Sequence, residues 1–363
     1  EFFTFIIEGN NFIASHTQTI KFHNYAHIIP AAPRQLEVIE KTISSVQLRW
    51  FIDSLVTFDK GWYYKVSYTW NSSGAWNVTE YHPKDKAIEK LEPDERRLNV
   101  TGLKYPNTLY DFRVSMRSAV APQNEGWSDP SSLIVKTKSC RPYRPPKTDR
   151  SSFEISSSEL TDEHRVVFIY WQPIPRLEYN GDNFTHDISV WQDGTPVHDA
   201  QLLSMHYSYA KYRIKFDNYR FVIRSKNVDG VSLNSSVVDV PSKDNILRTP
   251  AIVSKVDYGE GVYELSWKPI EGVSNVSYTA FWCETIREYP YQCDGFIDWE
   301  HLRGDATKFN FTTYNHAGGH QSVEFQFAVS AVTADSSSGM IWASCTVLHD
   351  TVNKINSVWV DKS

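Results

Sequence analysis

Cysteine, methionine and long apolar runs are scarce in this chain of 363 residues. It contains only 4 Cys and 3 Met. Four cysteines are few for a chain of this length, so its cores must be held mainly by packing. No apolar run of about 20 residues could span a bilayer, and we expect no leader segment of the secretory type within these residues. Helical periodicity over long stretches is missing as well, which argues against a helical bundle.

The chain also lacks an excess of positive charge. Its formal net charge is -6 at pH 7, and no basic stripe interrupts the sequence. Proteins that bind nucleic acid neutralise phosphates with clustered Lys and Arg. We therefore expect no nucleic-acid partner.

Sequence signatures of catalysis are missing. The chain has no Gly-x-Ser-x-Gly elbow, no phosphate-binding loop and no His-Glu-x-x-His motif. His316 and His320 come closest to a metal-binding pair. The Ala-Gly-Gly between them and the lack of a nearby Cys favour a flexible turn instead. We expect a protein that is not an enzyme and has neither a cofactor nor a metal site.

Aromatic residues are abundant, at 14% of the chain, and they recur in short alternating segments. Three such segments end in Trp: Val46-Leu48-Trp50, Val167-Ile169-Trp171 and Tyr263-Leu265-Trp267. A later aromatic segment follows each one: Tyr110-Phe112-Val114-Met116, Tyr219-Phe221-Ile223 and Phe325-Phe327-Val329. Alternation of this kind indicates strands with one face in a core. A repeat of about 110 residues with one buried Trp per unit is typical of β-sandwich domains.

Proline clusters mark the limits between these repeats, because Pro cannot donate to a strand ladder and stiffens linkers. The predicted fold is all-β, with tandem fibronectin type III β-sandwiches arranged end to end. The predicted domains are residues 30–139, 140–249 and 250–363, the last including a linker. Residues 1–29 are predicted to be a hairpin from the end of a preceding, truncated module.

Seven Asn-x-Ser/Thr sequons point to the secretory route and to N-linked glycans. About three would be expected by chance from the composition of the chain. The predicted acceptors are Asn71, Asn77, Asn99, Asn183, Asn234, Asn275 and Asn310. The sequence therefore favours an extracellular segment.

The first complete module ends in Glu125-Gly126-Trp127-Ser128-Asp129-Pro130-Ser131, just after a strand that carries Arg113 and Arg117. This segment resembles the Trp-Ser-x-Trp-Ser box of class I cytokine receptors, with Pro130 in place of the second Trp. An indole can lie between guanidinium planes four positions apart on one strand face. We expect Trp127 to stack on Arg113 or Arg117, and Ser128 and Ser131 to bond to neighbouring backbone.

The resemblance extends over most of the chain and is closest to the interleukin-six signal-transducer type, especially its invertebrate members. It rests on Trp171-Gln172-Pro173, Tyr179-Asn180-Gly181 and Arg224-Ser225-Lys226-Asn227 in the second module. In the third module it rests on Phe281-Trp282-Cys283, Pro290-Tyr291-Gln292-Cys293 and Asp298-Trp299. Cys283 and Cys293 are close enough in sequence for a strand-to-strand disulfide, and the resemblance implies one there. Cys140 and Cys345 are expected not to pair with each other.

The resemblance implies a single-pass type I receptor at the cell surface that binds a secreted four-helix cytokine. It further implies Janus kinase/STAT signalling through a cytoplasmic tail, with a receptor homodimer or a co-receptor. Loops at apposed sandwich ends are free to vary on a rigid scaffold, so the ligand is expected at the elbow before the first complete module. The candidate contacts are Phe58, Asp59, Lys60, Gln123, Asn124 and Glu125. The alternative function is that of a cell-adhesion or guidance receptor built from the same sandwiches.

Overall fold

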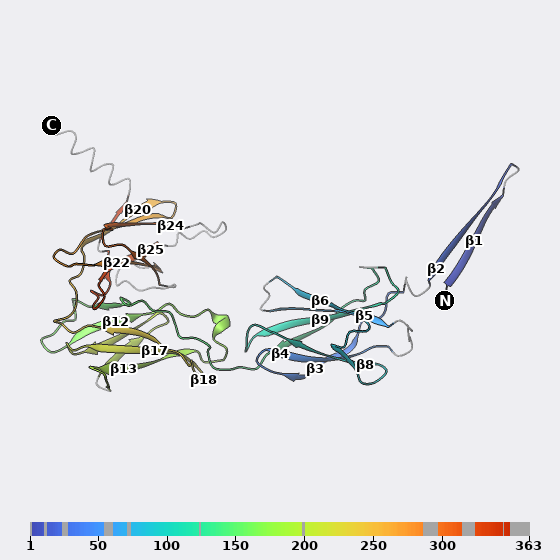
Figure 1. Cartoon of the computed structure of the whole chain (residues 1–363), viewed down its shortest axis with the longest axis horizontal. Coiled ribbons are helices and arrows are strands. Elements are labelled where there is room, and N and C mark those ends of the chain that lie inside the picture. Colours follow the sequence, from blue (N-terminus) through green and yellow to red (C-terminus); the bar gives the residue numbers. More distant parts are fainter. Residues whose placement is uncertain are drawn as a thin grey trace. The chain divides into compact units, whose positions relative to one another are not determined.

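The computed structural model describes residues 2–10, 13–23, 28–53, 61–70, 74–122, 125–197, 200–285, 297–313, 324–343 and 345–348 (Figure 1). The chain forms two compact units, residues 1–141 with 180–182 and residues 142–179 with 183–363. Strands make up nearly all of the regular structure, and the described residues contain a single helical turn, η2 (Arg176–Glu178). The predicted all-β class with β-sandwiches in tandem is confirmed.

The first unit contains a two-stranded antiparallel hairpin of β1 (Phe2–Asn10) and β2 (Ser15–His23). It also contains sandwich 1, in which two four-stranded sheets face each other. One sheet has the order β3 (Arg34–Lys41), β4 (Ser45–Phe51), β8 (Glu95–Thr101), β7 (Ile88–Lys90). The other has the order β10 (Ser131–Lys136), β9 (Leu109–Ser118), β5 (Trp62–Trp70), β6 (Asn77–Tyr81).

The second unit contains sandwiches 2 and 3. Sandwich 2 pairs β11 (Phe153–Ile155), β12 (Arg165–Tyr170), β16 (Tyr209–Ile214) and β15 (Gln201–Met205) in one sheet. Its other sheet has the order β14 (Thr195–Pro196), β13 (Thr185–Gln192), β17 (Tyr219–Asn227), and β17 then pairs with both β18 (Gly230–Val231) and β19 (Ser236–Val240).

Sandwich 3 is built in the same way. One sheet has the order β24 (Lys308–Thr312), β21 (Val262–Lys268), β20 (Ala251–Gly259), β27 (Cys345–Leu348). The other has the order β23 (Asp298–Leu302), β22 (Ser277–Thr285), β25 (Glu324–Val332), β26 (Ile341–Trp342). The proline clusters lie in the connections between the last strand of one sandwich and the first of the next, residues 137–152 and 241–250, and the domain limits drawn from them stay a prediction.

Each sandwich closes around the tryptophan that the repeat predicts. Trp50 and Trp171 are fully buried, and Trp267 is 4% exposed. The alternation of β4 puts Val46 and Leu48 beside Trp50 in one core. Burying such side chains stabilises each sandwich by about 25 cal/mol per Å² of apolar surface removed from water.

A serine joins the last strands of every sandwich in the same manner. In sandwich 1, the Ser128 N–H donates to the Met116 carbonyl at 2.9 Å, and the Met116 N–H donates to Ser128 Oγ at 3.1 Å. Ser232 makes the same pair of bonds with Ser225, and Ser338 makes them with Ala331. Ser128, the serine of the Trp-Ser box in sandwich 1, therefore makes a pair of strand-joining hydrogen bonds that all three sandwiches share.

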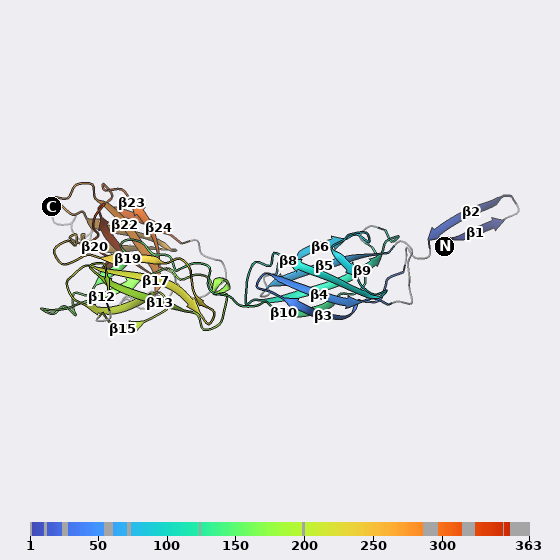
Figure 2. The same ribbon diagram turned by 60° about the horizontal axis from the view of Figure 1, so that its bottom comes forward.

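Sandwiches 2 and 3 pack face to face within the second unit (Figures 1 and 2). Their shared cluster contains Tyr170, Tyr209, Phe281, Cys283, Ile297, Ala328, Met340 and Trp342. Glu154 Oε2 accepts hydrogen bonds from the Tyr170 hydroxyl at 2.8 Å and from the Trp342 indole at 2.9 Å. The Met340 N–H donates to the Phe153 carbonyl at 2.6 Å. Polar and apolar contacts together join the faces of these two sandwiches, so the predicted end-to-end arrangement is wrong for this pair.

Candidate functional site

The candidate site begins on the outer face of the β5–β9 pair in sandwich 1. Trp62, Tyr64 and Val66 of β5 face the core, so the residues between them face outward. The register places Tyr63 opposite Arg117 and Ser67 opposite Arg113. Cationic and aromatic side chains are thereby brought together on one surface.

A ladder of cations and rings runs along this surface. The Arg117 guanidinium carbon lies 4.1 Å from the centre of the Tyr63 ring and 5.2 Å from that of Trp127. On the Trp127 ring, Lys65 Nζ lies 4.2 Å from the centroid. The Tyr63 ring also meets the His82 ring edge-on, with centroids 5.0 Å apart. Trp127 thus contacts two cations, Lys65 and Arg117.

Arg113 stacks on a different ring. Its guanidinium carbon lies 4.1 Å from the centre of the Trp76 ring. Trp76 comes from the segment before β6, not from the box. Of the two predicted arginine partners, the structure therefore brings Arg117 to Trp127 and Arg113 to Trp76.

The ladder is tied to the loop that follows β9. Arg117 is 5% exposed, and its Nη1 donates to the Ala121 carbonyl at 3.2 Å. Gly126 has a φ of +72°, and a Cβ there would lie 3.3 Å from the Ala121 Cβ, so a side chain at this turn would be strained. Ser131 Oγ donates to the Pro33 carbonyl. The box therefore connects the loop, strand β9 and the segment that leads into β3.

Two long connections meet at this end of sandwich 1. The Ala119 N–H donates to the Gly61 carbonyl at 3.1 Å, which joins the connection after β9 to the one before β5. Glu125 is exposed here. The other candidate ligand contacts, Phe58, Asp59, Lys60, Gln123 and Asn124, lie outside the described residues, so their role stays a prediction.

The predicted glycan acceptors within the described residues are all exposed: Asn77, Asn99, Asn183, Asn234, Asn275 and Asn310. Asn71 lies outside them. Asn77 pairs with Tyr68, toward the end of β5 that is remote from Trp62. Sugars at Asn77 would leave the loop-bearing end accessible.

The cysteines are described only in part. Cys283 is disulfide-bonded and is 1% exposed in the shared cluster of sandwiches 2 and 3. Cys293 lies outside the described residues, so its pairing with Cys283 stays a prediction. The side chain of Cys345 is also outside them, and its relation to Cys140 stays untested. His316 and His320 also lie outside the described residues.

Comparison with known proteins identifies several receptors with similar sequences. No protein-family model matches the chain. A cytokine receptor of Drosophila melanogaster is 27% identical over an alignment of 361 positions, which covers 95% of this chain and 26% of that receptor. The human leukemia inhibitory factor receptor is 20% identical over 85% of this chain and 26% of its own length. The rat oncostatin-M-specific receptor subunit beta is 19% identical over 86% of this chain and 30% of its own length.

The resemblance to class I cytokine receptors is confirmed. These relatives are receptors by name, in agreement with the expectation that the chain is not an enzyme. The chain spans roughly a quarter to a third of their length. Among solved structures, the FN1–FN3 domains of chicken CNTN1 align with a TM-score of 0.37 at 15% identity, over 86% of this chain and 99% of that chain. Within the described residues, no helix is long and apolar enough to cross a bilayer.

Three ladder residues were not singled out from the sequence: Tyr63, Lys65 and Trp76. The outward positions of Tyr63 and Lys65 follow from the alternation of β5, so this signal was present. Trp76 had no such signal, because its place over Arg113 depends on the pairing of β5 with β6. The sequence alone does not give that register.

Proposed function

We propose that this chain is part of the extracellular region of a class I cytokine receptor that binds a secreted four-helix cytokine. The ladder at Trp127 is the observation that carries the proposal. It connects a Trp-Ser box to the connection after β9 through Arg117 and the Ala121 carbonyl. In this proposal the box is a support that holds a ligand-binding loop, and it does not itself contact ligand.

The ligand would meet the elbow between sandwich 1 and the module that precedes it. The segment leading into β3 reaches this end of the sandwich, because Arg34 pairs with Phe51 at the close of β4. The connections at 52–61 and 119–130 are joined there by the Ala119–Gly61 bond. Phe58 is the proposed anchor, because a large apolar side chain in a polar loop gains most when a partner covers it.

The remaining parts of the proposal concern the whole receptor. The exposed sequons would carry N-linked glycans, and the chain would lie outside the cell as part of a single-pass type I membrane protein. Janus kinase/STAT signalling would come from a cytoplasmic tail, after association with a second receptor copy or a co-receptor. Sandwiches 2 and 3 would act as spacers below the ligand-binding elbow.

The test uses an ectodomain extended upstream of Glu1, immobilised and exposed to secreted four-helix cytokines of the same organism. Phe58→Ala should raise the dissociation constant of the bound cytokine about 30-fold, which corresponds to a hot spot of about 2 kcal/mol. Leu109→Ala is the matched control. Leu109 is 50% exposed and opens β9 at the opposite end of sandwich 1, so affinity should not change.

Two results together would overturn the elbow: an unchanged dissociation constant for Phe58→Ala, and full affinity after deletion of everything before Pro30. If no cytokine binds but the ectodomain adheres to itself or to matrix proteins, the adhesion alternative is favoured.

A further inference from the structure

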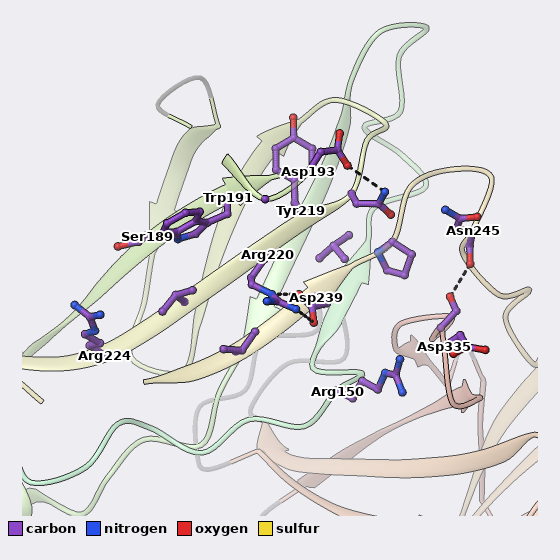
Figure 3. Close-up of a pocket in the computed structure, with 17 residues that line it drawn as sticks. Arg150, Ser189, Trp191, Asp193, Tyr219, Arg220, Arg224, Asp239, Asn245 and Asp335 are labelled. Carbon is purple, nitrogen blue, oxygen red and sulfur yellow. Dashed lines mark hydrogen bonds and ion pairs between the residues drawn. The ribbon is translucent and has the colours of Figure 1, made fainter. Parts of the chain in front are cut away.

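A groove with a volume of about 1020 Å³ lies in the second unit, on the outer face of the β13–β17–β19 sheet (Figure 3). Trp191, Arg220 and Asp239 project from three neighbouring strands onto its floor. Asp335 and Ser336, from the turn after β25, form one wall. The volume is at the upper end of the range for small-molecule sites.

The wall is fixed to sandwich 2 by hydrogen bonds. Arg150 Nη1 donates to the Thr333 carbonyl at 3.0 Å and also to the Ala334 carbonyl. Ser336 Oγ donates to the Asn245 carbonyl at 2.6 Å. The groove is therefore formed by both sandwiches of this unit and does not depend on a loose loop.

The floor of the groove combines an exposed indole ring with a pair of charged side chains. Trp191 is 36% exposed and Val237 is 39% exposed. Arg220 and Asp239 form two hydrogen bonds, of 2.7 and 3.1 Å, beside them. Sugar rings fit such a surface, because their C–H faces pack on an indole while their hydroxyl groups both donate and accept at planar polar side chains.

The charges of the lining favour a neutral ligand. The lining contains three guanidinium groups and three carboxylates, from Arg150, Arg220, Arg224, Asp193, Asp239 and Asp335. Because these charges balance, the groove offers a sulfated or phosphorylated ligand little electrostatic attraction.

A source of sugar lies next to the groove. Asn234 is an exposed glycan acceptor two residues before β19, the strand that contributes Val237 and Asp239 to the floor. At about 3.3 Å per extended residue, Asn234 and Val237 are roughly 10 Å apart along the chain. The Ser232 hydroxyl donates to the Asn234 carbonyl at 2.8 Å and fixes this turn.

We propose that the N-glycan on Asn234 folds back into this groove and packs its neutral core sugars on Trp191. The inference rests on the extracellular, glycosylated state proposed above. The glycan would contact the floor of sandwich 2 and the wall of sandwich 3 together, and so brace the packing of the two sandwiches.

The test uses the secreted chain with uniform high-mannose glycans, trimmed by an endoglycosidase under native conditions. Glycopeptide mass spectrometry follows release at each sequon. Release at Asn234 should be at least about 10-fold slower than at the exposed control sites Asn275 and Asn310, which corresponds to about 1.4 kcal/mol of protection. Trp191→Ala should bring Asn234 to the control rate and leave both controls unchanged.

Two further variants keep the test decisive. Val237→Ser removes apolar surface from the same floor and should also speed release at Asn234. It serves as the test variant if Trp191→Ala is poorly secreted. Leu202→Ala is the matched control, because Leu202 is 48% exposed on the other sheet of sandwich 2 and should leave protection intact.

The inference is overturned if Asn234 carries no glycan, if its glycan is released as fast as those of the controls, or if protection survives both floor variants. It is also overturned if Trp191→Ala weakens cytokine binding while the glycan is unprotected, because the groove would then hold a protein partner. A chain that binds no cytokine but shows protection dependent on Trp191 would refute the proposed receptor function and leave this site standing.

Discussion

Replacing Trp127 by Ala removes the ring that two cations share. Lys65 Nζ lies 4.2 Å and Arg117 Cζ lies 5.2 Å from its centroid. A cation–π contact contributes about 0.5–1 kcal/mol at an exposed site and about 2 kcal/mol or more when desolvated. Since Arg117 is 5% exposed, its contact belongs near the upper value. Trp127→Ala should therefore destabilise sandwich 1 by about 2–3 kcal/mol.

The assay is calorimetry of the secreted full chain, followed through the unfolding transition of the first unit. For a domain of about 100 residues, 1 kcal/mol shifts the midpoint by roughly 4 °C, so a decrease of about 8–12 °C is expected. Trp76→Ala is the matched control. It removes the stack on Arg113, whose side chain is 45% exposed, and should cost no more than about 1 kcal/mol.

A second substitution tests the geometry of the stack. Arg117→Lys keeps the charge, but an ammonium group cannot stack as a plane. We expect a loss between those of the two Trp variants, and faster proteolysis within residues 119–127, because the bond to the Ala121 carbonyl is lost. A midpoint decrease below about 2 °C for Trp127→Ala, or equal decreases for both Trp variants, would refute the ladder as a support of the loop.

Two further predictions concern the second unit. Non-reducing peptide mapping should recover Cys283 linked to Cys293, and reduction should cost about 2–3 kcal/mol of stability; recovery of two free thiols would contradict this. Burial lowers the pKa of His186 from 6.5 to about 4, so the unfolded state takes up the proton first as pH falls. The stability contributed by neutral His186 is fully present above pH 6.5, and the free energy of unfolding falls by about 3 kcal/mol as pH drops from 6.5 to 4. Measured by urea unfolding, the His186→Leu variant should therefore lose less stability than the native chain between pH 7.5 and 4.5. Identical losses in the two proteins would count against this explanation.

The sandwich architecture was predictable from the sequence because its determinants are local. Strict alternation before Trp50 and Trp267 places those side chains in a core whatever the neighbouring modules do. The hydrogen bond of the tyrosine in the late strand is equally local. Tyr110 accepts from the Tyr105 N–H at 2.9 Å, five residues away. Short-range patterns of this kind indicate a sandwich without knowledge of strand pairing.

The candidate site was predictable only in part. Trp127 and Arg117 stand out because a box follows an arginine-bearing strand, and both features are contiguous in sequence. The position of Trp76 over Arg113 depends on how β6 pairs with β5. Register of this kind is set by tertiary context as well as by local pattern.

The packing of sandwich 2 on sandwich 3 shows where sequence patterns cease to specify a structure. In β12, Val167 and Ile169 face the core of sandwich 2, yet the alternate residues Phe168 and Tyr170 are aromatic and pack on the cluster shared with sandwich 3. An uninterrupted apolar strand indicates burial on both faces, but it does not say which surface covers the second face. Glu154 supplies that specificity, because its carboxylate joins Tyr170 to Trp342, a residue 188 positions away. If sandwich 3 were shifted along the face of sandwich 2, the Glu154 carboxylate and the Trp342 indole N–H would lose their mutual hydrogen bond. This polar pair therefore favours the observed arrangement over others that bury a similar apolar area.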